Sequence, residues 1–99
     1  MNSNINIGHS IENAQTITGM KSVEVAKQLG VSKQLFRYYR KSEDISVSHA
    51  IKLTNIFNLS MQEFIKLGEK DPVTFKNDLI AEIDEELQTS SEFTYSNNR

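Results

Sequence analysis

Apolar residues recur at three- and four-residue intervals along most of the chain, which is the spacing of amphipathic helices. The first two sets each stop at a glycine, and glycine often ends a helix because it takes a left-handed conformation without strain. These sets are Ile11, Ala14 and Ile17 before Gly19, and Val25, Ala26 and Leu29 before Gly30. The pattern predicts two short helices, and the period-two alternation of strands is scarce.

Four further helices are expected after residues that can cap a helix N-terminus. The expected caps are Ser32, Ser46, Ser60 and Asp71. The third helix would run through about Lys41 and the fifth would end at Gly68. The side chains expected to face inward from the third and fourth helices are Phe36, Tyr39, Ala50, Leu53, Ile56 and Phe57.

The fifth and sixth helices carry the clearest local start signals. Ser60 and Glu63 have the spacing of a capping box, and Leu59 and Phe64 have that of a hydrophobic staple. Asp71 precedes Pro72, and proline suits the first position of a helix. A sixth helix is therefore expected to run from there to about Gln88.

Composition narrows the class of protein. The chain has 99 residues, 37% hydrophobic and 24% charged, with no cysteine. The absence of cysteine excludes disulfides, zinc fingers and thiol catalysis. No apolar run is long enough to span a membrane. The start of the chain has no signal-peptide pattern, so a cytoplasmic location is expected. Two histidines forty residues apart offer no metal site. No cofactor is expected, and an enzyme is the weakest reading because no nucleophile–base pair or phosphate loop is present.

The charges are unevenly distributed. Residues 20–52 carry seven cations and three anions, whereas residues 53–99 carry four cations and nine anions. An uneven distribution of charge often reflects only which faces of the protein are exposed to solvent. A basic middle and an acidic end would also suit contacts with two different partners.

The stretch Ser22–Tyr39 has the pattern of a helix-turn-helix. Ala26 is small where two helices would cross, Gly30 allows the tight turn, and Val31 and Phe36 would bury it. Together with the helices on either side, this stretch resembles the phage repressor and Cro-type family, often called the XRE family. The resemblance covers about residues 11–68. It implies an all-α fold: a five-helix repressor-like helix-turn-helix domain, here with an additional amphipathic C-terminal helix.

The resemblance also implies which residues meet DNA. In this family the second helix of the motif lies in the major groove, and here that helix spans about residues 32–41. Transferred by position, the base-contacting residues would be Lys33, Gln34 and Tyr38, with Leu35 and Arg37 at the margins. The residues expected to contact phosphates are Lys21, Ser22, Ser32, Arg40, Lys41 and Ser42. Of the two adjacent tyrosines, Tyr39 is assigned to the core and Tyr38 to DNA.

The chain departs from the family pattern at two places. The family usually has an acidic residue at the position of Arg40 and a basic one at that of Gln15, so that internal ion pair is expected to be absent. Arg40 would then be available for phosphate or for another partner. In the loop after the recognition helix, Glu43 and Asp44 would repel phosphate.

The sixth helix has an apolar stripe of its own. Its members are Phe75, Leu79, Ile80, Ile83 and Leu87. Such a stripe can dock on the helix's own domain, or it can pair or swap with a second chain. The expected division is a DNA-binding domain over 10–68, a dimerisation or partner-binding helix over 71–89, and a flexible tail over 90–99.

These observations predict a sequence-specific regulator of double-stranded DNA, a repressor of phage or mobile-element type that binds its operator as a homodimer. Two such modules would read half-sites about 34 Å apart. The alternative is an antitoxin-like or other protein-interaction module that uses the helical scaffold and the acidic last helix to bind a protein partner. No membrane contact is expected in either case.

Overall fold

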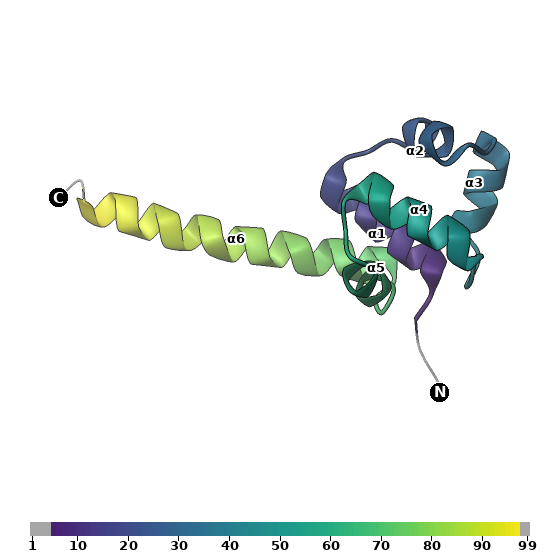
Figure 1. Ribbon diagram of the computed structural model, residues 1–99. Helices are drawn as coiled ribbons and strands as arrows, with labels where there is room; N and C mark the ends of the chain where they lie inside the picture. The colour runs from purple at the N-terminus through teal and green to yellow at the C-terminus, as the bar shows by residue number, and fades with distance from the viewer. Residues whose placement is uncertain (1–4, 98–99) are drawn as a thin grey trace.

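A computed structural model describes the backbone of residues 5–97 and the side chains of residues 5–85. Within that part the chain is entirely helical, with six helices and no strand. The helices are α1 (Ile7–Thr18), α2 (Ser22–Leu29), α3 (Lys33–Arg40), α4 (Val47–Phe57), α5 (Met61–Leu67) and α6 (Pro72–Asn97). The first five pack together, and α6 projects from them as a long arm (Figure 1). The molecule consequently measures 57 × 33 × 21 Å.

The helix ends follow the local signals in the sequence. Gly19 and Gly30 have φ angles of +75° and +83°, so both end their helices in the left-handed conformation. Ser32, Ser46 and Ser60 accept hydrogen bonds from backbone amides of the helices that follow them. The capping box is complete, because Ser60 Oγ accepts from the Glu63 amide and the Glu63 carboxylate accepts from the Ser60 amide. The predicted starts of α3, α4 and α5 are confirmed.

The first helix begins earlier than residue 10. Asn6 caps it by accepting from the His9 amide at 3.1 Å, so residues 7–9 form its first turn. That turn ties the domain together, since the amides of Ile7 and Gly8 donate to the carbonyls of Glu43 and Ser42 at 3.0 and 2.9 Å. The expected boundary at residue 10 left out this turn, although Ile7 lies one four-residue step before Ile11 and packs against the core.

The core lies between α1 and the other four helices of the domain. Its fully covered apolar side chains are Ile11, Ala14, Val25, Ala26, Leu29, Phe36, Leu53, Phe57 and Phe64. Tyr39 and Ile56 are partly buried and pack against this cluster. Ile17 differs from the inward residues of its helix, because 51% of it remains exposed.

A buried asparagine joins α1 to the segment between α5 and α6. The side-chain amide of Asn13 is fully buried and donates to the carbonyls of Leu67 and Lys70 at 2.7 and 3.0 Å. The Leu67 carbonyl lies at the end of α5, where no amide of the same helix can reach it, and the Lys70 carbonyl lies in the segment between α5 and α6. Asn13 therefore sets where α6 leaves the domain.

The sixth helix starts as expected but ends later. Asp71 accepts from the Thr74 amide at 2.8 Å, which caps the helix. The expected end near Gln88 is wrong, because the helix continues through Asn97 and no glycine or proline follows Pro72 to stop it. The tail expected over 90–99 thus falls on this helix up to residue 97, and residues 98–99 lie outside the described part.

Candidate nucleic-acid interface

The exposed face of α3 carries the side chains that were expected to read bases. Lys33, Gln34 and Arg37 are exposed, as is 67% of Tyr38. Gln34, Arg37 and Tyr38 are three and four residues apart, so they lie on one side of the helix. The opposite side holds the buried Phe36. The structure therefore presents a continuous polar and aromatic row to solvent, anchored by one aromatic residue in the core.

A hollow lies beside this row, between the start of α2 and the length of α3. Its volume is about 380 Å³. The residues that line it are Ser22, Lys33, Gln34, Phe36, Arg37 and Arg40. Five of these six side chains are polar or charged, and the three cations among them make the hollow suitable for an anionic ligand such as a phosphate backbone.

Arg40 connects three helices behind the hollow. Its guanidinium lies 3.3 Å from the carboxylate of Glu12 on α1 and donates to the hydroxyl of Ser22 on α2 at 3.3 Å. Gln15 on α1 donates to the same hydroxyl at 3.0 Å. The family's ion pair between positions 15 and 40 cannot form here, because Gln15 is uncharged and position 40 is an arginine. Arg40 has another partner on α1 instead, Glu12, which is the second of the two alternatives expected for this residue.

The sequence held a signal for this partner. Glu12 is the only acidic or basic residue among the first nineteen apart from a histidine, and it lies about one helical turn before Gln15. Only the packing of α1 against α3 shows that Arg40 reaches it. Contact of Arg40 with a phosphate remains a prediction, and it requires the guanidinium to share or leave Glu12.

The other residues expected to contact phosphates differ in exposure and in the hydrogen bonds that they already make. Lys21 and Lys41 are exposed, whereas Ser22 and Ser42 are half-buried. The Ser32 hydroxyl accepts from the Leu35 amide, and the Ser42 hydroxyl donates to the Tyr38 carbonyl at 2.8 Å. The two lysines are thus the freest of these groups, and the serines already have structural roles.

The two tyrosines of α3 differ in burial: Tyr39 lies against the core as predicted, whereas contact of the exposed Tyr38 with DNA stays a prediction. Tyr39 packs against the core, and its ring centroid lies 5.3 Å from that of His49 on α4. Tyr38 points to solvent, with its ring centroid 6.4 Å from that of Tyr39. Leu35 is 40% exposed, which leaves it at the edge of the polar row.

The loop after α3 keeps its acidic character. Glu43 and Asp44 are both exposed. Asp44 accepts from the Ile45 amide at 2.9 Å, and the Glu43 carbonyl accepts from the start of α1. These carboxylates border α3 and would repel a phosphate placed against the loop.

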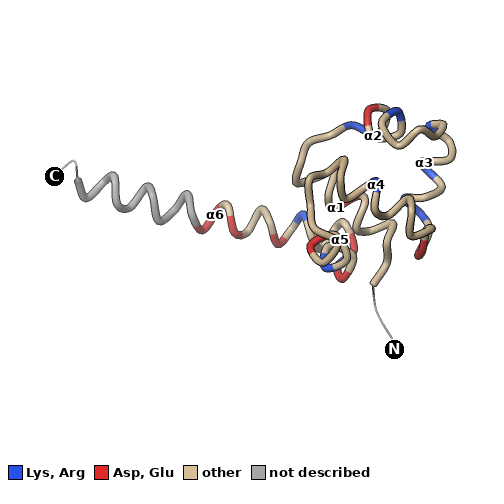
Figure 2. The backbone as a smooth tube through the Cα atoms, viewed as in Figure 1, with Lys and Arg blue, Asp and Glu red and all other residues tan. Residues whose placement is uncertain are grey.

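The residues expected to bind a second chain lie on α6, at the other end of the molecule from α3 (Figure 1). Phe75 and Leu79 are half-buried, while Ile80 and Ile83 are 55% and 48% exposed. The side chain of Leu87 lies outside the described residues. Figure 2 shows basic residues on α2 and α3 and acidic ones along the described part of the arm.

Two charged groups secure the base of the arm. Lys70 pairs with Asp78 at 2.5 Å, and this hydrogen bond raises the pKa of the Lys70 ammonium above its ordinary 10.5. The backbone amide and then the hydroxyl of Thr74 donate to Asp71, which lowers the pKa of that carboxyl below its ordinary 3.8. Both arrangements favour the helical start of α6.

Three broader observations bear on function. No family model, no curated protein and no solved structure matches the chain. Among the described residues, no helix is long and apolar enough to cross a bilayer. The same residues hold no group of three histidine or acidic side chains that could bind a metal ion.

Proposed function

We propose that this protein is a sequence-specific regulator that binds double-stranded DNA, with the five-helix helix-turn-helix fold of the phage repressor and Cro-type family. The observation that carries the proposal is the exposed row of Lys33, Gln34, Arg37 and Tyr38 on α3. A helix fits the major groove of B-DNA, and such a row can face base edges there. The short turn at Gly30 that joins α2 to α3 supports the same fold.

Each side chain of the row has a suitable chemistry. The side-chain amide of glutamine can accept from N6 of adenine and donate to its N7, and a lysine can donate to the acceptors of guanine. Each good bidentate contact discriminates between bases by roughly 1–3 kcal/mol. Phosphate contacts from Lys21 and Lys41, on either side of the row in sequence, would supply affinity that falls with salt.

The proposed regulator acts as a homodimer and represses by occupying its operator. One module of this size covers only a short half-site, so two modules related by a twofold axis are needed for a specific site. The arm leaves the domain away from α3, so a second chain bound to it would leave the proposed reading face free.

Binding to DNA tests the proposal directly. A labelled duplex from the region upstream of the protein's own gene is compared with a scrambled duplex between about 50 and 300 mM salt. A preference of about a thousandfold that persists at high salt supports a base-reading regulator. Weak binding to both duplexes that disappears with salt means that the operator lies elsewhere, and absence of binding at low salt contradicts the proposal.

The reading residues are tested with a matched pair of variants. Lys33→Ala with Gln34→Ala should remove most of the preference for the operator and leave the fold intact. Lys52→Ala with Gln62→Ala removes the same residue types from exposed positions on α4 and α5, and should have little effect. Equal operator affinity of both variants would show that α3 does not read bases.

A protein-interaction module, such as an antitoxin, is the second candidate. The exposed Ile80 and Ile83 on the acidic arm favour it, because these apolar side chains have no cover from their own domain. A toxin-like gene beside this one, together with a folded protein that binds no DNA at low salt, would favour this function. The two candidates are compatible, since antitoxins of this kind can also regulate their own genes.

A further inference from the structure

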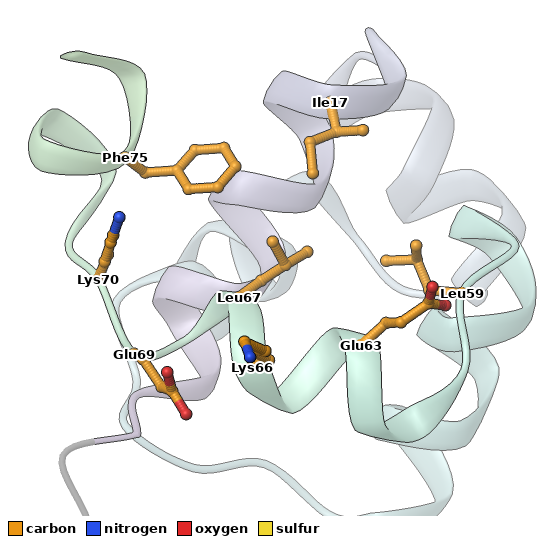
Figure 3. A pocket seen from close by; sticks show the side chains of 8 residues that line it. All are labelled: Ile17, Leu59, Glu63, Lys66, Leu67, Glu69, Lys70 and Phe75. Atoms are coloured by element: carbon orange, nitrogen blue, oxygen red, sulfur yellow. The ribbon is translucent and has the colours of Figure 1, made fainter. Parts of the chain in front are cut away.

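An apolar groove lies at the base of α6. Ile17 from the end of α1, Leu67 from α5 and Phe75 from α6 point toward one another around it, and Leu59 lies at one side (Figure 3). These four residues define the α1–α5–α6 groove, whose volume is about 380 Å³. The groove is separate from the hollow beside α3, with which it shares no residue.

The groove leaves apolar surface uncovered in the single chain. Ile17 is 51% exposed, and the other three side chains are half-buried. The arm continues this surface, because Leu79 and Ile83 follow Phe75 at successive four-residue steps along α6. Groove and arm together form an apolar strip of the kind that marks an interface.

The arm of the same chain cannot fill this groove. Residues 73–85 form uninterrupted helix with no glycine or proline, so the arm has no hinge there. Ile83 lies eight residues beyond Phe75, about 12 Å further along the helix axis at 1.5 Å per residue. Its side chain therefore lies beyond the groove, on the arm that leaves the domain.

We propose that the α1–α5–α6 groove receives the arm of a second copy of this chain, and that Ile80 and Ile83 are the residues inserted. The exchange is reciprocal about a twofold axis, so each chain gives one arm and receives one. This proposal deepens the dimeric regulator described above by naming its interface. It is tested without DNA, so its failure and the failure of DNA binding are distinguishable.

Charge favours the groove over pairing of the two arms. Arms laid side by side would bring together their acidic residues, Asp78, Glu82, Asp84 and Glu85, against a single cation, Lys76. The rim of the groove carries fewer carboxylates, with Lys66 against Glu63 and Glu69, because Lys70 is already paired with Asp78 of its own chain. The Glu63 carboxylate also already accepts from the Ser60 amide at 2.8 Å. An acidic helix thus meets less like charge in the groove than on another arm.

The experiment measures self-association of the full chain by sedimentation without DNA. The arm variant is Ile80→Asp with Ile83→Asp, and the groove variant is Ile17→Asp, at positions that are about half exposed. The control is Ala81→Asp, which adds a carboxylate, as the groove variant does, at an exposed position about 100° or more around the helix from both isoleucines. Circular dichroism of each variant verifies that the helices are retained.

We expect the arm variant and the groove variant each to raise the dissociation constant of the dimer about tenfold or more, whereas the control leaves it within about twofold. Mixing the arm variant with the groove variant should restore an intermediate affinity, because the mixed dimer keeps one intact arm in one intact groove. A groove variant that dimerises like the wild type would overturn the proposal in favour of arm–arm pairing. A wild-type chain that stays monomeric at about 100 μM would also overturn it.

Discussion

Arg40 and Glu12 form an ion pair between α3 and α1, with 3.3 Å between the guanidinium nitrogen and the carboxylate oxygen. About a third of each side chain is exposed, so water screens the pair and its contribution to stability is small. Its effect on position is larger, because the same guanidinium also donates to Ser22 at the start of α2. Arg40 thus holds together the three helices that shape the proposed DNA-binding face.

Glu12→Gln should increase the salt dependence of DNA binding. The neutral amide no longer attracts Arg40, whose guanidinium becomes free to contact a phosphate. One additional phosphate contact steepens the logarithmic salt dependence of the binding constant by about one. The measurement is binding to a fixed duplex at several salt concentrations, with Glu69→Gln, at an exposed site on the other side of the domain, as the control. An unchanged slope would mean that Arg40 does not reach DNA.

Asn13→Ala should destabilise the protein by about 1–3 kcal/mol, because two carbonyls near the end of α5 lose their donor and a buried space opens. Urea unfolding followed by circular dichroism gives this value. Asn55→Ala, an exposed change on α4, should cost well under about 1 kcal/mol. Equal stability of the two variants would show that Asn13 does not secure the start of the arm.

Alanine substitutions at Gly8 and Gly30 should destabilise the protein to very different extents. A Cβ at Gly8 would lie 2.3 Å from the Arg40 carbonyl oxygen, so Gly8→Ala forces α1 away from the end of α3. A Cβ at Gly30 meets nothing within 4 Å, so Gly30→Ala should destabilise the protein only through the backbone strain of an alanine at a φ angle of +83°, about 1 kcal/mol. Thermal unfolding should show Gly8→Ala to be the less stable by several degrees. The reverse order would contradict the close approach of α1 to α3.

Substitutions of the two tyrosines of α3 should have different effects, with Tyr38 affecting DNA binding and Tyr39 affecting stability. Tyr38→Ala removes an exposed ring and should weaken DNA binding while leaving the unfolding free energy within about 0.5 kcal/mol. Tyr39→Ala removes a ring that packs on the core and on His49, and should cost about 1–3 kcal/mol. Denaturation and operator binding are measured on both variants. A large stability loss at position 38 would contradict its exposed placement.

The cap of α6 should depend on pH. The lowered pKa of Asp71 means that the folded chain favours the carboxylate, so this stabilisation is present above the ordinary value of 3.8 and is lost as the pH falls through the lower folded value. Asp71→Ser keeps an acceptor but cannot titrate. Its loss of helicity relative to the wild type, measured by circular dichroism, should therefore be visible at pH 6 and should shrink in acid below the ordinary carboxyl pKa. A difference independent of pH would contradict the role of the charge.

The sequence alone determined the end of α2 and the starts of α3, α4, α5 and α6. The signals at Gly30, Ser32, Ser60 and Asp71 act within one helical turn, so each can be recognised without the rest of the chain. The exposed row of α3 was predictable for the same reason, once Phe36 was assigned to the core. The late end of α6 was not, because no local residue marks it.

Only the tertiary structure decided which distant residues meet. Asn13 is separated from Lys70 by 57 positions and Glu12 from Arg40 by 28, and neither periodicity nor capping relates residues so far apart. The half-exposed Ile17 likewise follows from the way α5 and α6 cross the end of α1. Helix positions depend on contacts within a turn, whereas the ion pair, the buried amide and the open groove depend on how whole helices pack.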